Sequence, residues 1–371
     1  MQKVIFIVDD NDTNLLAAEN VLEKKYKVFT LPSAAKMFTL LDKLMPDLIL
    51  LDIEMPEMDG FEAILKLKNN PSWVNIPVIF LTAILDPVIE ASGFKLGAVD
   101  FITKPFSEPV LLNRVKTHLD IDGIIRQRTE KLLKLQNALV YTLADMVESR
   151  DEITGGHIER TSTFIKILVD AIISRGIYYN EISKLNLDLF VVSARLHDTG
   201  KIAISDTILN KPGKLTDEEF TKMKTHASMG EQIVEQIITR AEEDEHETFL
   251  YHAKLFAGYH HERWDGKGYP HGLAGTDIPI QGRIMAFADV YDALISDRPY
   301  KKAFTHEQAV KIIEEGHGTQ FDPVITDVFL EVNEIFDCIN LKDNECKKLC
   351  QKLNMPNQTG INKTCYKEMF I

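Results

Sequence analysis

The sequence lacks the features that mark several large classes of protein. It has only four cysteines, all between residues 338 and 365, at spacings that match no common zinc module. We therefore expect reduced thiols rather than a disulfide framework. No stretch reaches the roughly 18 to 20 uncharged apolar residues that span a bilayer. The amino-terminal residues also lack the basic start and cleavage site of a secretory signal. These absences predict a cytoplasmic protein with no membrane partner.

Positive charge is scarce as well. The 371 residues include 42 Lys and Arg against 56 Asp and Glu, which gives a net charge of −14. Nucleic-acid polymers are bound through surplus Lys and Arg, so we expect no such partner. A small anionic ligand is still compatible with this balance, because metal ions and a few local cations can outweigh the overall charge. The length allows two domains and a connector.

Five short apolar runs recur in the first 120 residues, with amphipathic stretches between them. The runs cover residues 4–8, 27–30, 48–51, 78–81 and 99–102. This alternation predicts an α/β domain, built as a doubly wound sheet of five parallel strands. In such a sheet, polar residues that follow the strands converge on one crevice.

The residues expected at that crevice indicate phosphoryl chemistry. Asp9, Asp10 and Asp52 would bring three carboxylates together, which requires a divalent cation, and oxygen ligands favour Mg²⁺. Thr82 and Lys104 follow two further strands and could contact an anionic group on Asp52. Each of these residues alone means little, since Asp after a strand is most often a turn former, but the set is more specific.

This part of the sequence closely resembles the response-regulator receiver domain. The matching segments are Val8 to Asp10, Leu51 to Gly60, Leu81 to Ala83 and Thr103 to Phe106. The resemblance implies that Asp52 accepts a phosphoryl group from a cognate histidine kinase, with Mg²⁺ bound by Asp9, Asp10 and Asp52. It also implies a cis Lys104-Pro105 peptide and a switch that involves Thr82, Lys104 and Phe101. Phe101 stands where many relatives have Tyr, so the switching ring would have no hydroxyl group.

Residues 107–150 predict a long helix. Ile125, Leu132, Leu139 and Met146 recur every seven positions, with Leu135 between them, as in a short coiled coil that could join two copies of the chain. Arg128 and Thr142 occupy other positions of the same seam, so a helix packed on its own domain is nearly as well supported. Asp120, Asp122 and Gly123 indicate a break near the start of the helix.

The helical period dominates from residue 151 to residue 340, which predicts a mostly α-helical bundle. Thr216 to Glu219 has the form of a capping box ahead of an amphipathic helix. We expect the domains to be a receiver over 1–120, a connector over 121–150, a helical domain over 151–340 and a peripheral tail over 341–371.

Histidines and aspartates in the helical domain stand in settings that indicate a metal centre. They are His157, His197, Asp198, His226, His260, His261 and Asp289. Burying such residues in a bundle without a metal would leave charges and ring nitrogens unpaired. Because Asp198 can bind one ion with each oxygen, the set predicts a bridged binuclear centre that activates water. Mixed imidazole and carboxylate ligation suits Fe, Mn or Zn.

The helical domain resembles the HD-GYP subfamily of HD phosphohydrolases. The matching segments are His197 to Lys201, Ile208 to Thr216, His260 to Pro270, Asp289 to Leu294 and Ser296 to Lys301. The resemblance implies that the seven residues above bind the metal ions, with Asp198 bridging and Fe or Mn preferred. Ile153 stands where members with a third metal have Glu, so we expect two ions.

The same resemblance implies hydrolysis of cyclic di-GMP under the control of phosphorylation at Asp52. Lys201, Arg298 and Lys301 would contact its phosphates. The loop Gly268-Tyr269-Pro270 would shape a binding or partner surface, with Tyr269 as an exposed aromatic. Another cyclic dinucleotide or nucleotide as substrate, or a non-catalytic signalling adaptor, are the alternatives. Residues 240–249 form an acidic insertion that we interpret as a solvated loop.

Overall fold

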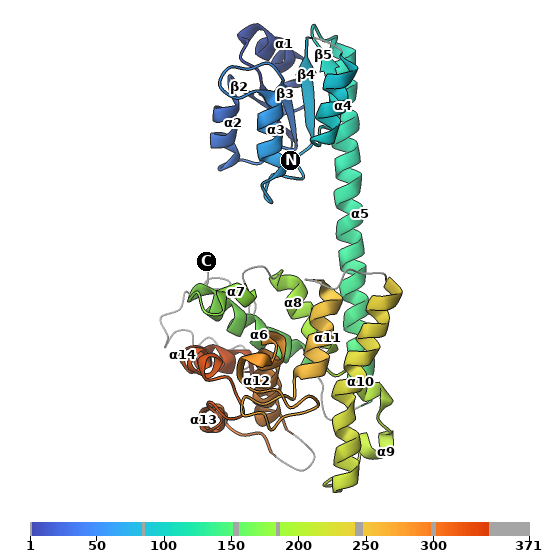
Figure 1. Cartoon of the computed structure of the whole chain (residues 1–371), viewed down its shortest axis with the longest axis vertical. Coiled ribbons are helices and arrows are strands. Elements are labelled where there is room, and N and C mark those ends of the chain that lie inside the picture. Colours follow the sequence, from blue (N-terminus) through green and yellow to red (C-terminus); the bar gives the residue numbers. More distant parts are fainter. Residues whose placement is uncertain are drawn as a thin grey trace. The chain divides into compact units, whose positions relative to one another are not determined.

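The computed structural model describes residues 2–83, 86–150, 156–182, 186–241, 248–297 and 302–340. Contacts within the chain divide it into two compact units, Met1–Lys134 and Leu135–Ile371. Figure 1 colours both units from the amino terminus to the carboxyl terminus. The expected carboxyl-terminal tail and most of the acidic insertion lie outside the described residues.

The first unit is built on a five-stranded parallel sheet with the strand order β2-β1-β3-β4-β5. The strands are β1 (Val4–Val8), β2 (Lys27–Leu31), β3 (Leu48–Asp52), β4 (Val78–Thr82) and β5 (Asp100–Thr103). Strands β3 and β4 are buried along their whole length, as expected when helices cover both faces. The predicted five-stranded α/β fold is therefore confirmed, with strand ends that differ from the apolar runs by one residue at most.

Helices cover the two faces of this sheet (Figure 1). Strand β1 alternates between the faces: Phe6 and Val8 pack with α2 (Ala34–Leu41), α3 (Gly60–Lys68) and α4 (Pro87–Lys95). Ile5 and Ile7 pack on the other face with α1 (Asp12–Leu22) and the start of α5 (Glu108–Glu148). This alternation follows from the period of two along a strand.

Helix α5 runs without interruption from Glu108 to Glu148, so the break expected near Gly123 is wrong. A Cβ atom at Gly123 would meet nothing within 4 Å, and a glycine in an exposed helix interior costs only about 1 kcal/mol, which the remaining turns can offset. The second unit buries the face of α5 that carries Val140, Ala144 and Val147. The heptad residues are on another face and stay exposed, namely Ile125, Leu132, Leu135, Leu139 and Met146. The helix thus packs on its own domain and also keeps an unburied apolar seam.

The second unit is an α-helical bundle over its described residues, which confirms the predicted class. Its helices are α6 (His157–Ser174), α7 (Tyr179–Ile182), α8 (Leu187–Ser193), α9 (Asp206–Leu209), α10 (Asp217–Ala241), α11 (Phe249–Tyr259), α12 (Ile280–Ile295), α13 (His306–Glu315) and α14 (Pro323–Asn340). Short 3-10 helices are η1 (Ala194–Leu196), η2 (Thr199–Ala203) and η3 (Gly275–Asp277).

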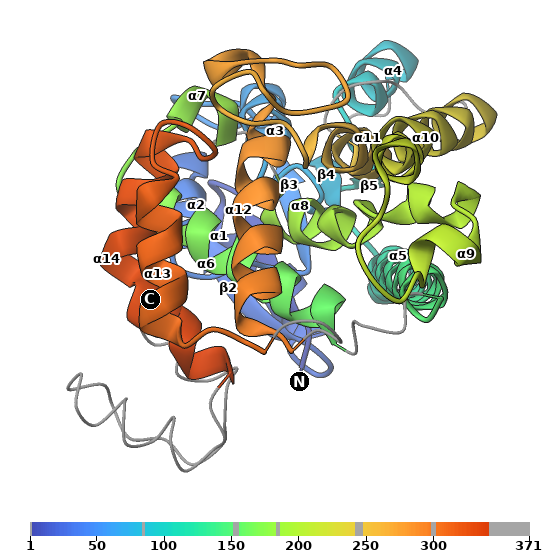
Figure 2. The ribbon, with the colours of Figure 1, turned by 90° about the horizontal axis from the view of Figure 1, so that it is seen from below.

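Helix α12 lies at the centre of this bundle, next to α6, α11 and α13 (Figure 2). Its buried residues join a core with Phe164, Phe329 and Phe336. The predicted capping box at the start of α10 is present: the Thr216 hydroxyl accepts from the Glu219 amide, and the Glu219 carboxylate accepts from the Thr216 amide. This cap fixes the start of the helix that carries His226. In the described part of the chain, no helix combines the length and the apolar character needed to cross a bilayer.

Candidate phosphoacceptor site and metal centre

Three carboxylates meet at the carboxyl edge of the sheet in the first unit. Asp9 follows β1 and Asp52 ends β3; oxygen atoms of Asp9, Asp10 and Asp52 lie within 4.8 Å of one another. Lys104 follows β5, and its Nζ is 2.7 Å from Asp9 Oδ2 and 2.6 Å from Asp52 Oδ1. Burial raises the pKa of Asp52, although the bond to Lys104 opposes this rise. Carboxylates crowded in this way fit a bound divalent cation.

The residues expected to form a switch lie around this site. Thr82 is buried at the end of β4. Phe101 in β5 is buried and packs between two rings: its centroid is 5.4 Å from that of Phe80 and 5.0 Å from that of Phe94. The Lys104-Pro105 peptide is cis, as the resemblance implied.

Two groups of imidazoles meet in the second unit, and Asp198 lies between them. One oxygen, Asp198 Oδ2, is 3.3 Å from Nε2 of His197. The other oxygen, Asp198 Oδ1, is 3.5 Å from Nε2 of His226 and 3.8 Å from Nε2 of His260. Each oxygen therefore faces a different group, which is the arrangement that a bridging ligand needs.

The hydrogen bonds of these rings determine which nitrogen atom faces the centre. The carbonyl oxygens of Ala194, Met223 and Phe256 accept from Nδ1 of His197, His226 and His260 at 2.9, 2.7 and 3.0 Å respectively. A carbonyl can only accept, so the proton of each neutral ring is on Nδ1 and Nε2 carries a lone pair. This is the tautomer of a metal ligand whose second nitrogen is held by the protein.

The Nε2 atoms of these rings lie close together, and the lone pairs of His226 and His260 point at each other. Nε2 of His226 is 3.2 Å from Nε2 of His260 and 3.1 Å from Nε2 of His261. In the other group, Nε2 of His157 is 3.5 Å from Nε2 of His197 and 3.6 Å from Oδ1 of Asp289. Facing lone pairs repel unless a cation lies among them, so these residues fit bound metal ions. They come from the ends or interiors of α6, α10, α11 and α12 and from the segment after η1.

Burial sets the charge of the centre before any ion binds. It lowers the pKa of His260 well below the usual range, lowers that of His226 and brings the pKa of His261 to about 4. Neutral rings are the form that binds metal. Burial alone would raise the pKa of Asp198, but Lys201 and the neighbouring rings hold it well below its usual value. Asp198 is therefore ionised, which is the form that a bridging ligand needs.

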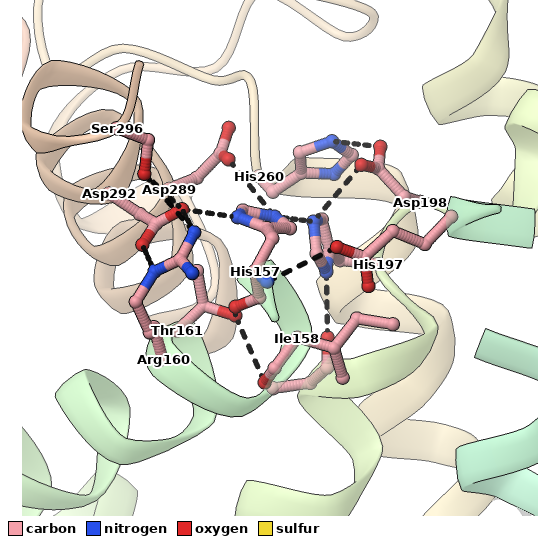
Figure 3. A network of polar contacts seen from close by, with 12 residues as sticks. His157, Ile158, Arg160, Thr161, His197, Asp198, His260, Asp289, Asp292 and Ser296 are labelled. Atoms are coloured by element: carbon pink, nitrogen blue, oxygen red, sulfur yellow. Dashed lines mark hydrogen bonds and ion pairs between the residues drawn. The ribbon is translucent and has the colours of Figure 1, made fainter. Parts of the chain in front are cut away.

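Asp292 and Arg160 support the centre, and sequence reasoning assigned neither of them a role. Asp292 Oδ2 accepts from Nδ1 of His157 at 2.7 Å. Arg160 donates from Nε to Asp292 Oδ1 at 2.5 Å and from Nη2 to Asp292 Oδ2 at 3.0 Å and to Ser296 Oγ at 3.1 Å. Figure 3 shows these side chains directed toward one another around His157. Burial disfavours charge on His157, but the bond to Asp292 and the nearby carboxylate charges together outweigh it and raise the pKa of His157, so a proton competes with a metal ion for this ring. The sequence signal was spacing: Asp292 lies three residues after Asp289, on the same face of α12.

A cavity of about 310 Å³ opens onto the centre. Its lining includes Asp198, His226, His261, Asp289, Arg160 and Lys201. Lys201 Nζ is 2.8 Å from Asp198 Oδ2, so a cation stands at the edge of the centre where a phosphate would enter. Arg298 and Lys301, the other expected phosphate contacts, lie outside the described residues, as does Ile153.

Tyr269 lines the same cavity and is partly buried, so the expectation that its ring is exposed is wrong. Its ring stacks on His261, with centroids 4.7 Å apart and an interplanar angle of 28°. The loop folds inward because buried Glu262 accepts from the amides of residues 271, 272 and 273 at 2.7, 3.1 and 3.0 Å. Gly268 permits this path, since a Cβ atom there would lie 2.4 Å from the amide nitrogen of Arg263.

Comparisons with known proteins agree with this division of the chain. The family model of the response regulator receiver domain matches residues 5–116, and that of the HD domain matches residues 142–325. A protein of Vibrio cholerae named "Probable cyclic di-GMP phosphodiesterase" is 42% identical over 343 residues, which cover 89% of this chain and 77% of that protein. The chain belongs to the response regulators with an HD domain. Divalent metal binding is a property that the HD domain implies.

Two further relatives of this HD-domain response regulator differ in their named substrates. The "Cyclic di-GMP phosphodiesterase response regulator RpfG" of Xanthomonas campestris is 33% identical over 343 residues, which cover 88% of this chain and 86% of the relative. The "3'3'-cGAMP-specific phosphodiesterase 2" of Vibrio cholerae is 38% identical over 200 residues, which cover 54% of this chain and 35% of the relative.

Proposed function

We propose that this HD-domain response regulator hydrolyses cyclic di-GMP in its second unit, under the control of phosphorylation at Asp52. One observation carries the proposal: the two oxygens of Asp198 face two separate groups of imidazoles at the edge of a cavity of about 310 Å³. The names of two relatives that cover most of the chain support cyclic di-GMP as the substrate. A metal-dependent phosphodiesterase needs these elements, a paired cation site with a pocket beside it.

The ligands divide into two sets that share Asp198. His157, His197 and Asp289 would hold one ion, and His226, His260 and His261 would hold the other. The mixed ligand set suits Fe, Mn or Zn, and the family resemblance favours Fe or Mn. Two such cations would supply a nucleophilic water at neutral pH and neutralise charge on the phosphodiester.

The chain's own residues then bind and orient the substrate. Lys201 stands 2.8 Å from Asp198 and contacts the scissile phosphate, where its charge stabilises the transition state. Arg298 and Lys301 contribute further phosphate contacts. Tyr269 forms a wall of the cavity and keeps His261 in place by stacking. Asp292 and Arg160 fix the orientation of His157.

The receiver provides the control. Asp52 accepts a phosphoryl group from a histidine kinase, with Mg²⁺ bound by Asp9, Asp10 and Asp52, and Lys104 neutralises the added charge. The Thr82 hydroxyl then hydrogen-bonds the phosphoryl group, and Phe101 responds by a change of packing, since its ring has no hydroxyl to exchange partners. Treatment of the protein with a small phosphodonor is expected to change its rate of hydrolysis, whereas Asp52→Asn is expected to show no change. An equal response of both proteins would count against control by Asp52.

The connector transmits the change through a dimer. We place the receiver at residues 1–120, the connector at 121–150 and the hydrolase at 151–340. The exposed heptad residues of α5, such as Leu132, Leu139 and Met146, support pairing with a second copy, because an unburied apolar seam of this period is typical of a coiled coil. Sedimentation is expected to give twice the chain mass for the parent and the single chain mass for Leu132→Glu/Leu139→Glu.

The test of the activity combines metal analysis of anaerobically purified protein with an assay of cyclic di-GMP hydrolysis. The parent is expected to contain metal and to hydrolyse the substrate, and His197→Ala to do neither. Cyclic GMP-AMP is the second candidate substrate, because one relative is named for its 3'3' isomer. The ratio of kcat/KM values for the two dinucleotides decides between them. Metal-loaded protein that hydrolyses neither would favour a signalling adaptor.

A further inference from the structure

Arg150 follows the end of α5 and forms hydrogen bonds with the turn that carries Lys201. Its Nη1 donates to the carbonyl oxygens of Lys201 and Ile202 at 3.2 and 3.0 Å. Its Nη2 donates to the carbonyl oxygen of Ile204 at 3.0 Å and to Asp206 Oδ1 at 2.7 Å. The side-chain amide of Asn210 in turn donates to the Arg150 carbonyl at 2.8 Å. One guanidinium therefore holds four acceptors along a segment of six residues.

The turn that Arg150 binds adjoins the metal centre. It is the 3-10 helix η2, which begins directly after the bridging residue Asp198 and includes Lys201. The Lys201 carbonyl also accepts from the Ile204 amide at 3.0 Å, and Arg150 adds a second donor there and donates to the carbonyls of Ile202 and Ile204 as well. The fork of a guanidinium can reach several carbonyls at once, which a Lys ammonium cannot match.

The opposite side of this turn has no room to move. A Cβ atom at Gly200 would lie 1.8 Å from the carbonyl oxygen of His226 and 2.5 Å from the amide nitrogen of Gly230, so the turn lies directly against α10. Arg150 on one side and α10 on the other thus determine where Lys201 and Asp198 stand. Loss or displacement of Arg150 would remove one of these two constraints and would alter the positions of Lys201 and Asp198.

The end of α5 also contacts His157 and the residue before His197. Glu148, the last residue of α5, accepts from the backbone amide of His157 at 3.2 Å. On the buried face of the same helix, Val140 packs in one cluster with Leu196, the residue before His197. The start of α6 at His157 and the segments before and after the His197-Asp198 pair are therefore attached to the last three turns of the connector.

We propose that Arg150 is a positioning residue for Lys201 and Asp198. We also propose that it couples α5 to this turn, so that a displacement of α5 alters the rate of hydrolysis. The second half of this proposal rests on the proposed function. In the described part of the chain, the contacts of the Arg150 side chain are to residues 201, 202, 204 and 206 and not to the metal ligands' donor atoms or the cavity lining, so it acts through the turn.

Amide hydrogen exchange tests whether the hydrogen bonds of Arg150 stabilise this turn, and the measurement does not depend on activity. Arg150→Ala is expected to exchange faster over residues 201–210 by roughly tenfold or more, as the loss of charge-assisted hydrogen bonds implies. Arg150→Lys is expected to recover only part of the protection. Arg175→Ala is the matched control, since Arg175 also binds a backbone carbonyl, that of Ala171, and a carboxylate, that of Glu331. Unchanged exchange over residues 201–210 in Arg150→Ala would overturn the proposal.

A double-mutant cycle tests the route through Lys201. Arg150→Ala is expected to lower kcat by roughly ten- to hundredfold with metal content retained, and to cause little further loss in a Lys201→Ala background. It is also expected to bring the rates of phosphorylated and unphosphorylated protein together. Additive losses of kcat in the double mutant would overturn the positioning role of Arg150. An undiminished response to phosphorylation in Arg150→Ala would overturn its role in coupling α5 to the turn. If the parent hydrolyses no dinucleotide, the proposed function is rejected instead. The exchange result would still decide whether Arg150 stabilises the turn.

Discussion

Asp292 on α12 accepts a hydrogen bond of 2.7 Å from Nδ1 of His157, the first residue of α6. The bond turns the opposite nitrogen, Nε2, toward His197 and Asp289. Two helices that are far apart in the sequence are thus joined at the point where a metal ion needs a ring of fixed orientation. The carboxylate would act on a bound ion through the ring that it holds.

Removal of this support should weaken metal binding. Asp292→Ala is expected to lower the affinity for the ion at His157 by about ten- to hundredfold, because outer-shell partners of metal-binding histidines have effects of this size. Competition with a graded series of chelators measures the affinity. Asp327→Ala is the control, since this carboxylate is exposed and pairs only with His317 among the described contacts. Equal affinities in the two variants would contradict the role of Asp292.

Lys201 should matter for the chemical step and not for metal binding. Its Nζ lies next to the bridging carboxylate and lines the cavity, so its charge is available to a phosphate. Lys201→Ala is expected to lower kcat by about 10² to 10³, the usual effect of removing one group that stabilises transition-state charge. Steady-state kinetics and metal analysis are measured on the same preparation. Lys267→Ala is the control, because that side chain is 81% exposed. Loss of metal together with activity would show that Lys201 serves the ligands instead.

The ring of Tyr269 should contribute through stacking and not through its hydroxyl. Tyr269→Phe keeps the ring on His261 and is expected to leave KM within about twofold of the parent. Tyr269→Ala removes the ring and is expected to raise KM by roughly two- to tenfold, the range that corresponds to one aromatic contact. The comparison of KM values in the two variants is the measurement. A larger defect in Tyr269→Phe than this would indicate a role for the hydroxyl group.

The fold was predictable where sequence periodicity and burial agree. The runs at 48–51 and 78–81 became the strands β3 and β4, which are buried throughout, because parallel strands covered on both faces must be apolar throughout. The break expected at Gly123 failed for the opposite reason: residues 120 to 123 have weak helix propensity, but the helical turns on both sides continue through them. Local propensity lost to the stability of the whole helix.

The candidate site was predictable only in part, because ligands follow motifs whereas their supports follow tertiary contacts. The spacing of Asp292 from Asp289 places both on one face of α12, but the role of Asp292 depends on a bond from His157, 135 positions earlier, which no sequence pattern shows. The inward position of Tyr269 depends on the bonds that Glu262 makes to the far end of the loop. No pattern of residues in the loop itself indicates this closure.

The metal content of Asp198→Ala tests the account most directly. In anaerobically purified protein, analysed by mass spectrometry of the elements, we predict two ions per parent chain. Loss of the shared ligand should remove both ions and abolish hydrolysis, because each oxygen of Asp198 faces one of the two groups of imidazoles. Retention of both ions by Asp198→Ala, or a fully active parent with no metal, would contradict a bridged binuclear centre.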